Sequence, residues 1–243
     1  MSKNEFWENS LPVGYYDQVL EKGNLNSKGI QSNWHNTTFK TLNEYVSLSD
    51  THLDYACGPG TFIGKYTDVE SIGVDISDDQ IRYAKDKYSH KGDFIYYKDF
   101  EIKNYKNYFD VITVIGLLEF LDDKSNLKVL EDLYFMLKPG GTLLMTTPNF
   151  RSTMTLLVMI INKFSKVSYK NQHVNRLNKN SVQKLLKKSK FQKDEIKVVK
   201  FINFGLMLSF FSWKLGSLFN DIISRSSLNF FGYLLLVRVK KEL

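Results

Sequence analysis

The sequence predicts an α/β fold in which helices cover both faces of a doubly wound parallel sheet. Over residues 50–148, short apolar strands alternate with helices at the spacing of βαβ units. Each strand of this region ends in a glycine-rich or acidic turn. Because ligands of such sheets bind at the carboxyl ends of the strands, these turns are the first candidates for a functional site.

The first predicted strands are short, and each runs into a polar turn. Ser77 can cap the helix after the second strand, and Asp78 and Asp79 suit its positive end. In chain order we expect a helix at Thr37–Leu48, strands at His52–Tyr55, Ser71–Ile76 and Asp93–Tyr97, and intervening helices at Thr61–Tyr66 and Ser77–Tyr88.

The fourth strand, Phe109–Ile115, is largely apolar, which is typical of a central strand. The helix after it is expected to stop at the Lys138-Pro139-Gly140-Gly141 turn. The remaining predicted elements are helices at Asn126–Leu137 and Asn178–Ser189, the latter capped by Asn178 or Asn180, and strands at Thr142–Thr147, Glu195–Ile202 and Phe230–Lys240.

The chain divides into an N-terminal lid segment, residues 1–50, and a domain over residues 51–243. Two segments of this domain, 150–177 and 203–229, are too long to be plain connections, and we interpret them as functional inserts. A single cysteine, Cys57, excludes a disulfide framework and a cysteine-rich zinc site. No signal peptide is apparent, so a cytoplasmic location is expected.

The net charge of +7 is unevenly distributed, with a net −7 over residues 1–150, +11 over residues 151–200 and +3 over residues 201–243. A basic tract of this kind indicates an anionic partner, or else a solvated, lysine-rich helix face. Thr153–Ile161 is too short to span a membrane, and Phe204–Ile223 contains Lys214, Asn220 and Asp221. Neither segment is expected to cross a membrane, but the chain can still bind to a membrane surface.

The turn after the first strand reads Asp54-Tyr55-Ala56-Cys57-Gly58-Pro59-Gly60. Its glycines allow close approach of a ligand to the backbone. A dinucleotide fingerprint fails because Ile63 occupies the place of the third glycine, and Asp54 would repel a pyrophosphate. A carboxylate there suits a cationic or amino-acid-like group. Asp75, at the end of the second strand, can accept hydrogen bonds from ribose hydroxyls, and Asp99-Phe100 can meet an adenine.

This combination resembles the class I S-adenosylmethionine-dependent methyltransferases, over about residues 50–148 and including Leu137–Leu143. The resemblance implies a Rossmann-like sheet of seven strands with the last one antiparallel, S-adenosylmethionine as cofactor and S-adenosylhomocysteine as product. It implies that the methionine part of the cofactor is held by Asp54 and by the Ala56–Gly60 loop, through Ala56, Cys57, Gly58 and Gly60. The other implied cofactor residues are Asp75 for the ribose, Ile76, Asp99 and Phe100 for the adenine, and Ile115 and Leu117 for the sulfonium end.

The segment after the fourth strand bears on the acceptor. It lacks the Asn/Asp-Pro-Pro-Tyr/Phe pattern of enzymes that methylate base amino groups. The ubiquinone-biosynthesis O-methyltransferases, a similar group, have Glu-x-x-Glu-His ending where Glu119-Phe120 stand. Because Gly116 and Phe120 replace the first acid and the histidine, we expect no metal there. Glu119 is interpreted as a structural or cofactor-loop acid.

The inserts are expected to carry the acceptor site for a small molecule or a lipid- or glycan-linked acceptor, with oxygen favoured as nucleophile. His173 is the candidate general base, because an imidazole titrates near neutral pH, or else it is bonded to the insert backbone. Further candidate substrate residues are Tyr16, His35 and Asn149. An RNA methyltransferase using residues 151–200 and a non-catalytic cofactor-binding scaffold are the alternatives, although nucleic acid is not the favoured partner. The chain is expected to be a monomer or homodimer.

The C-terminal insert is predicted to contain an amphipathic helix. Its apolar face would hold Met207, Phe211, Leu215, Leu218 and Ile222, and its opposite face Ser209, Gly216, Ser217 and Asn220. Together with the apolar, lysine-flanked stretch Met154–Ile161, such a helix suits an interfacial anchor on an anionic membrane or a lid over a lipid-like acceptor. Packing of the two inserts on each other, or across a dimer interface, is the competing interpretation.

Overall fold

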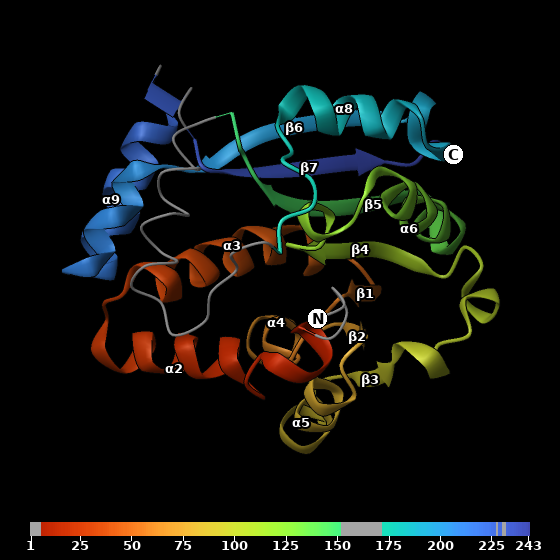
Figure 1. Ribbon diagram of the computed structural model, residues 1–243, viewed down its shortest axis with the longest axis horizontal. Helices are drawn as coiled ribbons and strands as arrows, with labels where there is room; N and C mark the ends of the chain where they lie inside the picture. Colours follow the sequence, from red (N-terminus) through yellow and green to blue (C-terminus); the bar gives the residue numbers. More distant parts are fainter. Residues whose placement is uncertain (1–5, 152–171, 227, 230–231) are drawn as a thin grey trace.

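The computed structural model describes residues 6–151, 172–226, 228–229 and 232–243. Within these residues a seven-stranded sheet has the order β3-β2-β1-β4-β5-β7-β6 (Figure 1). The strands are β1 Thr51–Tyr55, β2 Glu70–Asp75, β3 Asp93–Tyr96, β4 Phe109–Ile115, β5 Leu137–Pro148, β6 Glu195–Ile202 and β7 Leu234–Lys240. The helices are α2 Tyr15–Asn26, α3 Ile30–Val46, α4 Thr61–Tyr66, α5 Asp78–Tyr88, α6 Asp123–Met136, α8 Lys179–Lys187 and α9 Trp213–Ser224.

The sheet is parallel except for β7, which runs antiparallel to both β5 and β6. This confirms the predicted sheet, and β4 occupies its centre over the predicted residues. The strand order reverses between β1 and β4, which pair directly with each other. Such a reversal opens a crevice at the carboxyl ends of the two strands, which is where the Ala56–Gly60 turn and Ile115 lie.

Helices cover both faces of the sheet (Figure 1). On one face α3 and α4 pack against β4, β5 and β7, in a cluster of Phe39, Leu42, Val46, Phe62, Val111, Leu144 and Leu236. On the other face α6 and α8 cover the next residues of the same strands, with Leu130, Leu133, Leu185, Ile112, Leu143 and Val237 in one cluster. The two clusters follow from the alternation of side chains along a strand.

The N-terminal helices are fixed to the domain by a buried carboxylate. Asp17 on α2 is fully buried, and it accepts hydrogen bonds from Lys87 Nζ at 2.6 Å, Tyr83 Oη at 2.7 Å and Tyr88 Oη at 2.8 Å, all on α5. Burial acts to raise the pKa of Asp17, but these bonds outweigh it and hold the pKa below its ordinary value. The division of the chain at residue 50 stays a prediction.

Four predicted boundaries were wrong. The helix expected from Asn126 begins at Asp123, because the Asp122 side chain caps it by accepting the backbone N–H of Ser125. The helix expected from Thr37 begins at Ile30, because Gly29 has a φ of 117° and the polar side chains of Asn33 and Asn36 are buried rather than solvated. The Lys138–Gly141 turn is part of β5, which starts directly after α6 ends at Met136. The last strand starts at Leu234 instead of Phe230.

The single helix expected in the C-terminal insert was also wrong. The insert forms a 3₁₀ segment, η6 (Phe204–Phe210), and then α9. Ser212 lies between them in an extended conformation, with a φ of −159° and a ψ of 134°, so one helix cannot run through. The Met154–Ile161 stretch lies outside the described residues. Among the residues that are described, no helix is long and apolar enough to cross a membrane.

Candidate functional site

The turn after β1 adopts backbone conformations that favour glycine. Ala56, Gly58 and Gly60 have φ angles of 68°, 54° and 70°. A Cβ atom placed on Gly58 would meet only Tyr16, at 4.0 Å, whereas one on Gly60 would lie 2.5 Å from Phe94. Gly60 is therefore required by packing, and Gly58 leaves the backbone accessible to a ligand.

Asp75 lies at the end of β2 and connects this turn to the start of α5. Its Oδ2 accepts the backbone N–H of Gly58 at 2.7 Å, and its Oδ1 accepts that of Ser77 at 2.9 Å. Burial raises the pKa of Asp75, although the backbone donors of Ser77, Gly58 and Ile76 act in the opposite direction. A carboxylate has about four lone-pair sites, so Asp75 retains the capacity to accept a further hydroxyl group.

Asp54 is the buried end of a short hydrogen-bond chain. The Thr113 hydroxyl donates to Asp54 Oδ1 at 2.7 Å, and His52 Nε2 lies 2.9 Å from the same hydroxyl. His52 Nδ1 contacts the Ser71 hydroxyl at 3.0 Å. When Asp54 is ionised and Thr113 gives its proton to it, His52 has to donate from Nε2 to the Thr113 oxygen, which sets the tautomer of His52.

Burial raises the pKa of Asp54 to about 7, although the Thr113 hydrogen bond opposes this, and Asp75 raises it further. Burial also lowers the pKa of His52 to about 3, so His52 is neutral. Asp54 therefore titrates near neutral pH, and a cation beside it would favour its ionised form.

The two residues predicted beyond β3 are placed differently from each other. Asp99 ends a short 3₁₀ turn, η2 (Tyr97–Asp99), and is exposed. Phe100 is buried, and its ring stacks on Tyr105 with centroids 4.8 Å apart. Phe100 thus contributes to the core, and Ile76 is half-buried directly after Asp75. Their proposed adenine contacts stay predictions.

Cys57 lies inside the turn but is buried in a cluster with Ile63, Ile81 and Phe94. Burial raises the pKa of its thiol well above the ordinary value. The thiol is therefore protonated, which suits a packing residue rather than a nucleophile.

The end of β4 holds a second group of residues. Ile115 and Leu117 are half-buried on either side of Gly116, whose φ is 66°. The next turn, η4 (Leu118–Phe120), carries Glu119, which is 3% exposed and accepts the Thr147 hydroxyl at 3.2 Å. Burial raises the pKa of Glu119 to about 7.

Glu119 also holds the segment that contains His173. Its carbonyl oxygen accepts the N–H groups of Val174 at 2.9 Å and Asn175 at 3.0 Å. His173 consequently stacks on Phe120, with ring centroids 5.2 Å apart and planes 21° apart. Burial, and then the charge of Arg176, lower the pKa of His173. The imidazole is neutral at neutral pH and can accept a proton.

Aromatic side chains from the N-terminal segment reach both groups. Trp7, on η1 (Phe6–Ser10), packs on Phe120 with ring centroids 4.5 Å apart. Tyr16 lies next to Gly58, and its ring is 5.3 Å from that of His35. Burial lowers the pKa of His35 to about 4, so His35 is neutral too. Sequence reasoning missed Trp7, for which the adjacent aromatic pair at positions 6 and 7 was the only signal.

Asn149 follows β5 and is buried. Its Nδ2 donates to the carbonyl of Gly232 at 2.8 Å, and its backbone N–H donates to that of Tyr233 at 2.7 Å. These bonds join the end of β5 to the start of β7. A role of Asn149 in binding substrate stays a prediction.

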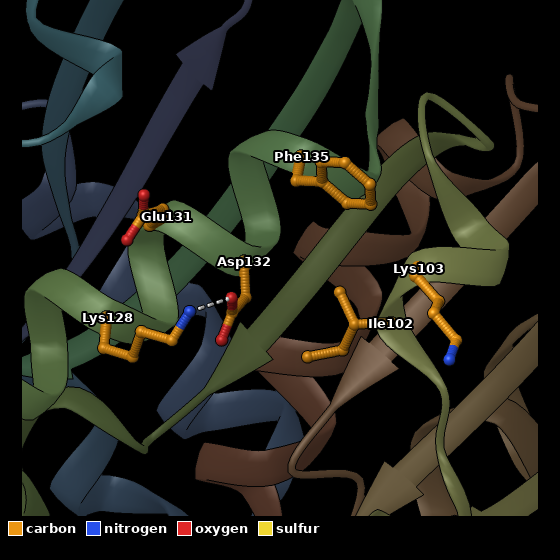
Figure 2. A pocket seen from close by; sticks show the side chains of 6 residues that line it. All are labelled: Ile102, Lys103, Lys128, Glu131, Asp132 and Phe135. Atoms are coloured by element: carbon orange, nitrogen blue, oxygen red, sulfur yellow. Dashed lines mark hydrogen bonds and ion pairs between the residues drawn. The ribbon is translucent and has the colours of Figure 1, made fainter.

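A shallow pocket of about 430 Å³ lies elsewhere, between α6 and the turn η3 (Ile102–Tyr105) (Figure 2). Figure 2 shows that Lys128 and Asp132, both on α6, form an ion pair on one wall of the pocket, with Nζ and Oδ1 2.8 Å apart. Its lining residues are Ile102, Lys103, Lys128, Glu131, Asp132 and Phe135. None of the predicted site residues is among them, so the candidate site is the strand-end crevice.

The comparisons with known proteins point to one family. Residues 29–196 match the family model described as a methyltransferase domain. The search of curated proteins found no match.

Solved structures with the same fold include a SAM-dependent methyltransferase from Archaeoglobus fulgidus, with 20% identity, a TM-score of 0.57 and coverage of 84% of this chain and 91% of that one. The plantazolicin methyltransferase BpumL, solved with a monoazolic desmethylPZN analog and SAH, has 18% identity, a TM-score of 0.62 and coverage of 99% and 94%. Magnesium protoporphyrin IX methyltransferase from Synechocystis PCC 6803, solved with SAH, has 12% identity, a TM-score of 0.57 and coverage of 88% and 85%.

Proposed function

We propose that this chain, which belongs to the methyltransferase domain family, uses S-adenosylmethionine to methylate a small-molecule or a lipid- or glycan-linked acceptor. Oxygen is the proposed nucleophile in preference to nitrogen. The observation that carries the cofactor site is the joint placement of Asp54, the open Gly58 backbone and Asp75 at adjacent strand ends. The acceptor is assigned to the neighbouring group around His173 and Phe120.

The residues present fit the cofactor. Asp75 offers free lone pairs to a ribose diol, and Asp54 offers a buried carboxyl group to a cationic methionine moiety. Among the described residues, only Tyr16 comes within 4.0 Å of a Cβ atom placed on Gly58. We assign Asp54 and the Ala56–Gly60 turn to the methionine part, Asp75 and Ile76 to the ribose and its surroundings, Asp99 to the adenine, and Ile115 and Leu117 to the sulfonium end.

The cofactor supplies an electrophilic methyl group when it is bound. The residues of this chain then have to bind the acceptor, direct its oxygen and take up the hydroxyl proton. Neutral His173 could take that proton on a ring nitrogen. Phe120 and Trp7 exclude water beside it, and positioning of this kind supplies much of the rate in methyl transfer.

Tyr16, His35 and Asn149 complete the proposed acceptor site. Tyr16 and His35 border the turn after β1, and Asn149 lies beyond β5. This proposal includes a cytoplasmic enzyme that contacts the inner face of the membrane to reach lipid-linked acceptors.

The test is transfer of a labelled methyl group from S-adenosylmethionine into fractionated cell extract. We expect label in the organic-soluble or small-metabolite fraction, and its loss in the His173→Ala variant. Label that enters RNA instead, or no label with cofactor bound, would contradict the proposed acceptor and favour the RNA-directed or non-catalytic alternative, respectively.

A further inference from the structure

The C-terminal insert turns its polar side inward. Asn33 of α3 donates from Nδ2 to Ser209 Oγ at 2.8 Å and to Ser217 Oγ at 3.2 Å. Asn203 N–H donates to Asn220 Oδ1 at 3.0 Å, and Asn203 Nδ2 donates to the Asn220 carbonyl at 2.9 Å. These bonds fix the rotation of α9, so the face opposite to its polar residues, with Leu215, Leu218 and Ile222, has to point outward.

The outward side carries large apolar side chains that are exposed to solvent. Phe210 and Phe211 are 65% and 69% exposed, and their rings contact each other with centroids 5.2 Å apart. Along α9, Leu215, Leu218, Phe219 and Ile222 recur at helical spacing, and each is more than two-fifths exposed. Leu25, at the nearby end of α2, is 87% exposed. We call these seven side chains the α9 surface. Soluble domains rarely leave so many large apolar side chains together in water.

Basic side chains surround this surface. Lys214 lies on α9 and Arg225 directly follows it, while Lys22 lies in the last turns of α2 and Lys28 just beyond that helix. The two helices are joined there, because the Trp213 N–H donates to the Ser27 carbonyl at 2.8 Å. None of these four cations forms an ion pair with a described residue, and α9 carries one acid, Asp221.

The α9 surface also stands at the functional edge of the sheet. The insert leaves the sheet at the end of β6, and Ile202 and Pro148 both pair with Leu234, so the ends of β5 and β6 lie at the same edge. Figure 1 shows α9 beside the end of β6 and next to the start of α3. Contact through α9 would therefore bring the acceptor site to whatever the surface binds.

We propose that the α9 surface docks on an anionic lipid bilayer, with its aromatic and aliphatic side chains in the interfacial region and the four cations among the headgroups. Apolar insertion combined with electrostatic attraction is the general basis of peripheral membrane binding. A second copy of the chain is the less suitable occupant, because a two-fold contact would bring the same cluster of cations from both copies together. The inference rests on the membrane contact included in the proposed function and names the surface that makes it. Vesicle binding requires neither cofactor nor acceptor, so a failure to bind vesicles is distinguishable from a failure of methyl transfer.

The test uses the full-length protein, sedimented with phosphatidylcholine vesicles that contain or lack phosphatidylglycerol. We expect binding to the anionic vesicles that weakens with salt. The double variant Phe211→Ser/Leu218→Ser should bind about tenfold or more weakly, since two large apolar side chains no longer enter the interface. Lys214→Glu/Arg225→Glu should lose the preference for phosphatidylglycerol.

Leu48→Ser is the matched control, because Leu48 is 86% exposed but precedes β1, at the opposite edge of the sheet. It should bind as the unmodified protein does, and thermal unfolding should show that all variants fold. Failure of the unmodified protein to sediment with anionic vesicles would overturn the proposal. The proposal would also be overturned if the unmodified protein were a dimer in solution and the Phe211→Ser/Leu218→Ser variant a monomer. A second copy of the chain would then cover the α9 surface.

Discussion

The Gly58 backbone N–H donates a 2.7 Å hydrogen bond to the Asp75 carboxylate, which joins the turn after β1 to the end of β2. These two residues are 17 positions apart in the sequence and belong to separate motifs. Their contact makes the turn and the acid one structural unit. A change in Asp75 should therefore affect the proposed cofactor site in two ways, through lost ribose contacts and through a displaced turn.

We expect Asp75→Ala to weaken S-adenosylmethionine binding about tenfold or more, because it removes hydrogen bonds to a charged group. Isothermal titration calorimetry measures this directly. Asp79→Ala is the control, since Asp79 is an exposed acid on α5. Equal affinities of the Asp75 variant and the unmodified protein would remove Asp75 from the site.

Cofactor affinity should rise with pH around neutrality. Asp54 has a pKa of about 7, so its carboxyl group ionises as the pH increases, and the ionised form attracts a cationic ligand. Between about pH 6 and about pH 8 we expect the cofactor affinity of the unmodified protein to rise up to about tenfold more than that of the Asp54→Asn variant. The variant corrects for titration of the cofactor itself. If the cofactor affinities of the two proteins change equally with pH, the charge of Asp54 does not affect cofactor binding.

Glu119 should make the protein less stable as the pH rises. Its folded-state pKa of about 7 exceeds the ordinary 4.5, so the folded state holds the proton more tightly than the unfolded state does. Its contribution to the free energy of unfolding therefore falls as the pH increases from about 4.5 to about 7, by about 3 kcal/mol at most.

Chemical denaturation of the unmodified protein and Glu119→Gln over this pH window tests the effect. The unmodified protein should lose stability relative to the variant as the pH rises. Glu44→Gln, at an exposed position on α3, controls for the substitution itself. A constant difference between the unmodified protein and Glu119→Gln would mean that the carboxyl group is not titrating in this range.

His173→Ala should lower the rate of methyl transfer by about a hundredfold, since a positioned proton acceptor contributes at least that much. The cofactor affinity should be unchanged, because His173 stacks on Phe120 and does not contact the turn after β1. Single-turnover rates and calorimetry separate the two quantities. His90→Ala removes an exposed histidine on the opposite part of the domain as a control. An unchanged rate would assign His173 to packing alone.

Local sequence patterns predicted the sheet well. Phe109–Ile115 and Glu195–Ile202 were placed over their observed residues, because their apolar content and flanking turns are sufficient signals. Ser77 caps α5 and Asn178 caps α8 as expected, each by accepting a backbone N–H group. These features depend on neighbours in the chain.

Features that depend on distant contacts could not be predicted. Asn33 gave no sign of being buried, since its partners Ser209 and Ser217 are about 180 residues away. The polar and apolar faces of α9 were predicted from the sequence. The apolar face is exposed because the polar face packs against α3, and the sequence alone does not show that packing. Similarly, Trp7 reaches the proposed acceptor site through Phe120, a contact between residues 113 positions apart in the sequence.

The most direct test of the cofactor site is calorimetric titration of the purified protein with S-adenosylmethionine and S-adenosylhomocysteine. We predict micromolar binding of both ligands at one site per chain, weakened by Asp75→Ala. Absence of binding by either ligand to the folded protein would contradict the methyltransferase account itself.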